Sequence, residues 1–419
     1  MHFIISHVAD ILPGNCLRPS DWTTGRSGRS QTEPSAQSER RRLDRQSSPR
    51  DADWTVSLAR ETQTGPVELC RQYAEAFKVS RQPPWFYGLF LHWRRLFEEP
   101  YRGISTDGHI RDGLFELQDG DVPIEAIAST ANAVLDVMPD NQRQRTCYHI
   151  DSPEWRSWSN PEFLLSGKGI RLDETTPELR QGILRVLELT LCPEGYQKAL
   201  AAMRINHFLA ALMQAPKVMN EFSYNFVLFG KPSVNSPWGF SFYGHHLCLS
   251  IFLYRREYKG TRILKNEEAL GLQLMQNLTP EEQRNAQVYK ELKDPSMPLG
   301  RWNHDDQRHL CGAFRDTGNT TIPYEGIRVS EMATAEQDLA LAIVNEYLLY
   351  LPKKSRGIRL EQIKSWFSET YWCWIGGFSD EDPFYYRIQS PVIIIEFDHH
   401  SGVFLNNAEP AKLHIHTLL

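Results

Sequence analysis

PVIIIEFDHH, residues 391–400, is the stretch that decides the fold. Its run of β-branched residues predicts a buried strand. The Ser401-Gly402 connection suits a hairpin turn, and SGVFL (401–405) and AKLHIHTLL (411–419) predict the next strands. FSYNFVLF (222–229) and WGFSFYGHHLCLSIFL (238–253) are also β-like. We therefore expect antiparallel strands from about 222–253 and 391–418 to share one sheet.

Helical patterns fill much of the remaining chain. Spaced apolar positions, Pro near helix starts and a capping box at Thr279 and Glu282 predict helices over 66–78, 121–138, 178–191, 194–213, 266–278, 280–292, 331–351 and 359–370. No internal repeat is apparent. The fold class predicted from these patterns is α+β, an antiparallel sheet with helices packed around it.

The N-terminal region has a different composition from the rest of the chain. Residues 18–53 are rich in Ser, Arg, Gln and Pro and nearly free of large apolar residues, which is typical of disorder. We expect residues 1–64 to be a mostly disordered tail. Residues 65–419 would form a single α+β domain, with a helical part over about 65–218 and a mixed sheet part over about 219–419.

The composition excludes several classes of protein. The formal net charge of -6 argues against a nucleic-acid binder, which normally carries a basic face. No stretch approaches the roughly 20 apolar residues that a membrane span needs. The seven cysteines include no close pair, as in a cytoplasmic protein with reduced thiols. Abundant aromatic residues suit a small-molecule pocket, so the expected partner is a small-molecule substrate.

Histidines and carboxylates gather in the strand-like segments. His414 and His416 are two residues apart, so they share one face of a strand, as Glu396 and Asp398 do on the preceding strand. If these strands pair, imidazoles and carboxylates converge in the ligand mix suited to zinc or iron. His245 and His246 add one more imidazole, since adjacent residues cannot both point the same way.

Other candidate residues carry less specific signals. Arg387 precedes the carboxylate strand, where it would bind a substrate carboxylate or pair with an acid of the fold. Tyr324 and Glu325 lie beside a predicted turn and would line the pocket or make local turn bonds. The motifs HExxH, GxSxG and GxGxxG and the P-loop are absent, so nothing supports a zincin, a serine hydrolase, a Rossmann domain or an ATPase.

Several segments together carry a family resemblance. They are EWRSWSNPEF (154–163), MNEFSYNFVLFGKPSVNSPWGFSFYGHHLCL (219–249), YKGTRILKNEEALGLQLM (258–275), IPYEG (322–326), WIGGFSDEDPFYYRIQSPVIIIEFDHHSGVFL (374–405) and HIHT (414–417). Over roughly residues 70–418 the chain resembles the domain-of-unknown-function 3500 family (DUF3500), in its fungal form. The resemblance implies a fold grouping and no reaction. The chain departs from the family's pattern by a missing segment between Tyr254 and Arg256, and by ending at Leu419 where family members usually continue.

Four functions follow from these residues. The first is a metal-dependent enzyme that acts on a small organic molecule by hydrolysis, with a zinc or iron ion on His245, His246, His414 and His416. Glu396, Asp398 and Arg387 would then be the catalytic residues. The alternatives are a non-haem iron oxidoreductase that uses oxygen, a metal-free lyase or isomerase with Asp398 and a histidine as an acid–base pair, and a non-catalytic binding protein.

Overall fold

The architecture comes from a computed structural model. It describes residues 4–8, 87, 91, 105–114, 120, 122–158, 167–216, 218–254, 265–298, 321–400, 409–412 and 414–418. Apart from the strand at Ile4–Val8, the predicted tail lies outside these residues. The predicted helix 66–78 and strand SGVFL also lie outside them.

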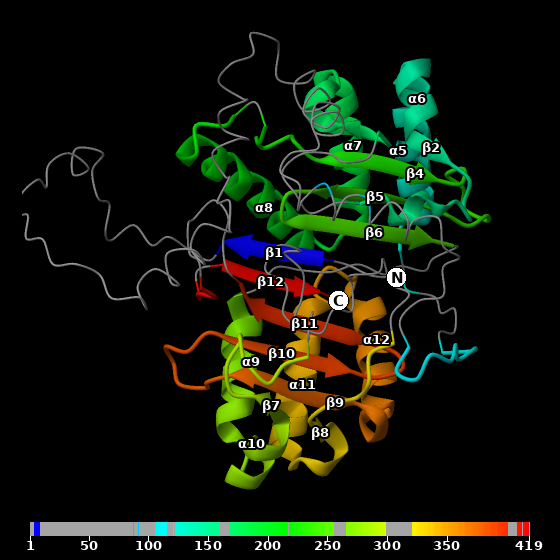
Figure 1. Cartoon of the computed structure of the whole chain (residues 1–419). Helices are drawn as coiled ribbons and strands as arrows, with labels where there is room; N and C mark the ends of the chain where they lie inside the picture. Colours follow the sequence, from blue (N-terminus) through cyan, green and yellow to red (C-terminus); the bar gives the residue numbers. More distant parts are fainter. Residues whose placement is uncertain are drawn as a thin grey trace, which may run out of the picture.

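One twelve-stranded sheet organises the chain, and the predicted α+β class is confirmed (Figure 1). Its strands run in the order β2 (Cys147–Tyr148), β4 (Asn225–Phe229), β5 (Trp238–Gly244), β6 (Leu247–Leu253), β1 (Ile4–Val8), β12 (His414–Leu418), β11 (Ile394–His399), β10 (Phe384–Gln389), β9 (Tyr371–Gly376) and β7 (Gln287–Tyr289). In addition, β3 (Ile170–Arg171) pairs with β4 and β8 (Ile327–Arg328) pairs with β9. The pairs β2·β4 and β7·β9 are parallel, and the others are antiparallel.

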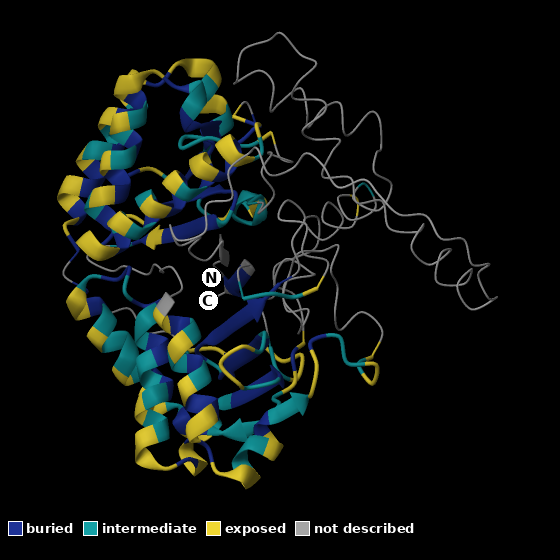
Figure 2. Cartoon of the chain, turned by 90° about the vertical axis from the view of Figure 1, so that its left-hand side faces the viewer, coloured by how far each residue is buried: buried dark blue, intermediate teal, exposed yellow. Residues whose placement is uncertain are grey.

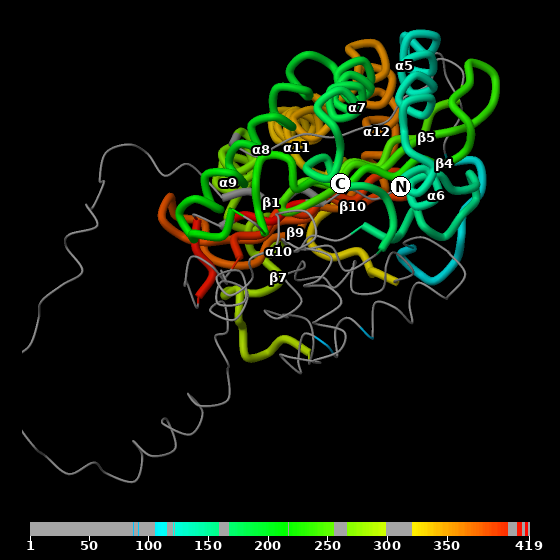
Figure 3. Tube along the Cα trace, turned by 90° about the horizontal axis from the view of Figure 1, so that it is seen from above, coloured from blue at the N-terminus to red at the C-terminus, as the bar shows by residue number. Residues whose placement is uncertain are grey.

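The larger helices pack against one face of this sheet (Figure 3). The helices are α5 (Ile124–Val137), α6 (Asp140–Thr146), α7 (Pro177–Thr190), α8 (Pro193–Leu212), α9 (Lys265–Asn277), α10 (Pro280–Ala286), α11 (Thr334–Tyr347) and α12 (Lys353–Ser365). The predicted capping box at the start of α10 is confirmed, with reciprocal bonds between Thr279 and Glu282. None of the helices in the described ranges is both long and apolar enough to cross a membrane.

Two parts of the prediction need correction. The helix predicted over 280–292 ends at Ala286, and β7 follows it directly. The strands β9 and β10 were not predicted. Both are buried almost throughout, so they lack the alternation of polar and apolar residues that identifies a half-exposed strand.

The two halves of the sheet have the same topology, which corrects the expectation of no repeat. The N-terminal repeat, α5 to β6, and the C-terminal repeat, α9 to β11, contain matching elements in the same order. Their strand registers also match: Asn225 pairs with Tyr243 as Tyr371 pairs with Gln389. The strand order is palindromic about the β1–β12 ladder, which we call the seam. The fold is therefore a fused pair of similar units.

Glycines at matching places support the duplication. Gly169 and Gly326 each precede an Ile-Arg strand, with φ of 76° and 82°. Gly230 and Gly376, with φ of 74° and 104°, each pack a hairpin turn closely against the next strand. L-residues with a side chain rarely adopt this left-handed conformation. The same backbone requirement therefore occurs at two corresponding turns of each repeat.

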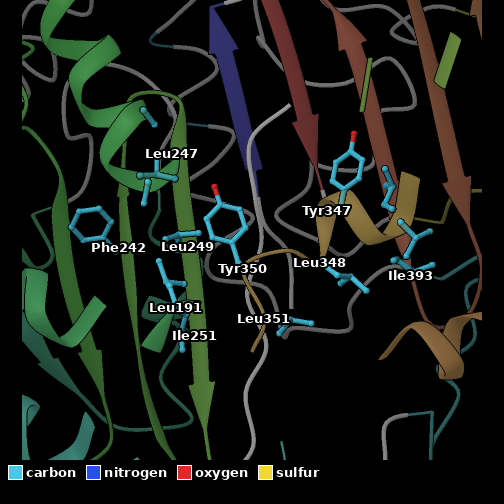
Figure 4. Close-up of a cluster of buried hydrophobic side chains, with 14 of the residues drawn as sticks. Leu191, Phe242, Leu247, Leu249, Ile251, Tyr347, Leu348, Tyr350, Leu351 and Ile393 are labelled. Carbon is cyan, nitrogen blue, oxygen red and sulfur yellow. The ribbon is translucent and has the colours of Figure 1, made fainter. Parts of the chain in front are cut away.

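A single hydrophobic core joins the repeats across the seam. Phe242, Leu247 and Leu249 of the N-terminal strands belong to the same buried cluster as Tyr350 and Ile393 of the C-terminal repeat (Figure 4). The helices turn their buried sides toward this core and their exposed sides outward (Figure 2). This packing fixes the two repeats against each other and so positions whatever lies at the seam.

Candidate functional site

The predicted carboxylates lie on the face of the sheet opposite the helix-packed core. Trp374, Tyr386 and Phe397 face that core. Strand alternation places Glu396 and Asp398 on the other face. Asp398 is paired in register with Tyr385 on one side and with His416 on the other. Directly paired residues share a face, so acids and an imidazole gather on one surface of the C-terminal repeat.

Asp398 and His400 form a buried hydrogen-bonded pair. Oδ2 of Asp398 lies 2.8 Å from Nδ1 of His400, and both side chains are 2% exposed. Burial raises the pKa of Asp398 well above its ordinary value, and the charge of His399 opposes this shift. The buried pair therefore favours a state that keeps its proton and carries no net charge.

Three more imidazoles continue from this pair. The rings of His400 and His416 are stacked, with centroids 4.4 Å apart and planes 12° apart. The ring of His246 lies 5.7 Å from that of His416, and the ring of His245 lies 3.7 Å from that of His246. We call His245, His246, His416 and His400 the histidine row. The row crosses the seam from the N-terminal repeat to the Asp398–His400 pair. It therefore joins three segments that are distant in sequence: the β5–β6 turn, β12 and the end of β11.

Arg387 and Glu396 lie next to Asp398 on the same face, two residues along their strands from the Tyr385–Asp398 pair. Arg387 and Glu396 are directly paired between β10 and β11. The Arg387 guanidinium donates to Oε2 of Glu325 at 2.8 Å and is 1% exposed. The hydroxyl of Tyr385 donates to Oε1 of Glu396. Of the two roles considered for Arg387, pairing with an acid of the fold is the one that this contact supports.

His399 points to the opposite side of the sheet from His400. Its Nδ1 accepts a bond from the backbone N–H of Phe384 at 2.9 Å, which leaves Nε2 as the nitrogen that donates to Glu268 at 3.2 Å. Burial raises the pKa of Glu268, but His399 and Lys412 together bring it below its ordinary value. This contact ties the end of β11 to α9, and it holds the strand that carries Asp398 and His400.

The predicted metal ligands do not form a cluster of the usual kind among the described residues. Within those residues, no group of three or more His, Cys, Asp or Glu side chains is arranged to hold a metal ion. His414 belongs to β12, but its side chain is outside what the structure describes. His400 and His416 are stacked with nearly parallel planes, whereas imidazoles that bind one ion direct their nitrogens at a common point.

Sequence reasoning missed two residues of the group. His400 was noticed in EFDHH but was not included in the site, although it lies two residues after Asp398 and so shares its face. Asn206 carries no motif at all. It lies on α8, where its Oδ1 is 3.0 Å from Nδ1 of His245. Only the fold brings α8 to the β5–β6 turn.

One comparison with known proteins gives a family, and none gives an activity. The model of one protein family, described as "Protein of unknown function (DUF3500)", matches residues 120–419. No curated protein matches the chain, and no solved structure matches it. The activity therefore has to be argued from the residues of the chain itself.

Proposed function

The chain belongs to the DUF3500 family, and we propose that it is an acid–base enzyme that moves a proton to or from a small organic molecule at the Asp398–His400 pair. The observation that carries this proposal is the 2.8 Å bond between two groups that are almost fully buried. A fungal origin and a cytoplasmic location remain predictions.

The chemistry follows from the shared proton. Because burial disfavours net charge, the pair favours a state that holds one proton between Asp398 and His400, which is the direction in which burial shifts the pKa of Asp398. Giving that proton to a substrate leaves an ionised carboxylate beside a neutral imidazole, which can then take a proton back. The pair can therefore act first as an acid and then as a base, as a lyase or an isomerase requires.

A second candidate is the metal-dependent hydrolase. A histidine that binds a metal usually donates its other ring N–H to a carboxylate, and the bond between His400 and Asp398 resembles that arrangement. His246, His416 and His414 would be the further ligands of a zinc or iron ion. The stacked geometry of His400 and His416 favours the first candidate, since imidazoles that bind one ion direct their nitrogens at a common point.

The proposal is tested by hydrogen exchange with solvent. We would incubate the purified full-length chain with a filtered extract of soluble small metabolites in D₂O and follow the compounds by mass spectrometry. We expect one compound or class to gain deuterium or to be converted, at a rate that His400→Gln lowers about 100-fold or more. Lys231→Gln, a change in the β4–β5 turn, is the control and should leave this rate unchanged.

Two further results separate the candidates. If activity survives a chelator and the protein carries no stoichiometric metal, the acid–base enzyme is supported. If a chelator abolishes activity and zinc or iron restores it, the metal-dependent enzyme replaces it. If wild type and His400→Gln leave every compound equally unchanged, the chain is not an enzyme of either kind on soluble metabolites.

A further inference from the structure

The histidine row is anchored by a polar side chain at each end. At one end Asp398 holds Nδ1 of His400, and at the other Asn206 holds Nδ1 of His245. The second anchor belongs to the N-terminal repeat, which the proposed acid–base chemistry does not otherwise involve. We infer that Asn206 is a positioning residue, which fixes His245 and through it the turn that brings His246 to His416.

The orientation of Asn206 follows from its hydrogen bonds. Its Nδ2 donates to the backbone carbonyl of Asn220 at 3.0 Å and to Oγ of Ser223 at 2.9 Å. Both amide hydrogens are thereby used, so Oδ1 is the atom that faces His245, and it can only accept. His245 must therefore carry a proton on Nδ1. The side chain of Asn206 thus selects both the ring position and the tautomer of His245.

The backbone around His245 is held as well. Its carbonyl accepts a bond from the hydroxyl of Tyr224 at 3.0 Å, and burial raises the pKa of Tyr224, which keeps the donor protonated. A Cβ on Gly244 would lie 2.8 Å from the carbonyl oxygen of Ser223, so only glycine fits there. The segment 220–224 and α8 together enclose this turn.

This support matters because His246 has a backbone conformation that side chains disfavour. Its φ is 59°, in the left-handed region, which is strained for a residue with a side chain. Such a conformation persists only where the surroundings impose it. Here the surroundings include the bonds to His245, and the ring of His246 lies 5.7 Å from that of His416.

The matching turn of the C-terminal repeat shows that the fold alone does not require a histidine held by a helix side chain. Between β10 and β11 the hydroxyl of Ser390 accepts bonds from the backbone N–H groups of Val392 and Ile393, and the backbone N–H of Ser390 donates to the carbonyl of Ile393 at 2.8 Å. No histidine stands there, and none of the residues of that turn has a positive φ. The Asn206–His245 contact therefore belongs to the N-terminal repeat alone, at the turn between β5 and β6.

The inference rests on the proposed function for its effect on turnover, but its geometry is tested separately. In the full-length chain with labelled histidines, NMR should show His245 protonated at Nδ1 and a contact between the ring protons of His246 and His416. Asn206→Leu should abolish both signatures. Asn206→Asp gives up the two bonds that Nδ2 donates but keeps an acceptor for the Nδ1 proton, and it should retain both signatures. Asn132→Leu, which removes bonds of a part-buried amide on α5, is the matched control and should change neither.

The possible results separate the inference from the proposed function. Wild-type His245 protonated at Nε2, or a ring contact of His246 that survives in Asn206→Leu, would overturn the positioning role whatever the activity. Turnover of the compound found by hydrogen exchange should fall by up to about 100-fold in Asn206→Leu and recover in Asn206→Asp. If both NMR signatures behave as expected and no turnover is found in wild type, the positioning role stands and the proposed function fails.

Discussion

Asp398→Asn is expected to lower turnover by about 100-fold to 10,000-fold while leaving the chain folded. The amide keeps the shape of the side chain and can still bond to Nδ1 of His400, but it cannot exchange a proton. Turnover would be measured on the compound identified by hydrogen exchange. Asp338→Asn, on an exposed position of α11, is the control and should leave both turnover and stability unchanged.

The same substitution has a pH signature in stability. The folded-state pKa of Asp398 is raised above its unfolded value of about 3.9, so the native state binds more protons between the two values. Its stabilising contribution is complete below about pH 4 and is lost as pH rises through the folded pKa. Asp398→Asn has no carboxyl at this position and so does not lose this contribution. Its free energy of unfolding, measured with denaturant, should therefore increase relative to that of wild type as the pH rises from about 4. If the difference in free energy of unfolding between variant and wild type stays constant across that range, the pKa of Asp398 is not raised in the folded chain.

Gly326→Ala is expected to destabilise the fold by about 3–5 kcal/mol. A Cβ at this position would lie 2.0 Å from the carbonyl oxygen of Trp372, and the φ of 82° already excludes most side chains. Gly169→Ala, at the matching turn of the N-terminal repeat, should be damaging for the same reason, because its Cβ would lie 2.6 Å from the carbonyl oxygen of Phe226. Chemical denaturation, or the soluble yield if the variants do not fold, measures both.

A third glycine provides the control for this pair. Gly357 lies in α12, and a Cβ there would meet nothing within 4 Å. Gly357→Ala should therefore stabilise the chain by about 0.5–1 kcal/mol, the usual gain for alanine in a helix. If Gly326→Ala or Gly169→Ala unfolds at the same denaturant concentration as wild type, the two turns do not have the matching backbone that the duplication requires.

Local patterns predicted the elements of the site better than its assembly. Alternation along EFDHH and HIH correctly predicted that Glu396, Asp398 and His416 share a face, because a strand fixes that relation within a few residues. The approach of His246 depends instead on β1, residues 4–8, which pairs with both β6 and β12. No local pattern encodes a pairing over such a separation.

The duplication had a short sequence signal that was easy to miss. Gly-Ile-Arg precedes a 3-10 turn and a helix at residues 169–171 and again at 326–328. The remaining matched positions differ in residue type: Ser241 and Ser250 of the first repeat occupy the places of Arg387 and Glu396 in the second. Because the two repeats share backbone geometry but differ in side chains, the sequence alone contains few matching residues that would reveal the duplication. At these two places the arginine and the acid occur in the second repeat, where the first has two serines.

The central claim is that Asp398 and His400 form a buried pair against which the imidazole of His416 stacks. Ring-to-ring NMR contacts in the histidine-labelled full-length chain, assigned with single histidine variants, test it most directly. The account predicts a contact between the ring protons of His400 and His416, and hydrogen-exchange protection, lost in Asp398→Ala, of the proton that Asp398 shares with Nδ1 of His400. A His400 ring that contacts only solvent, or that behaves identically in Asp398→Ala, would contradict it.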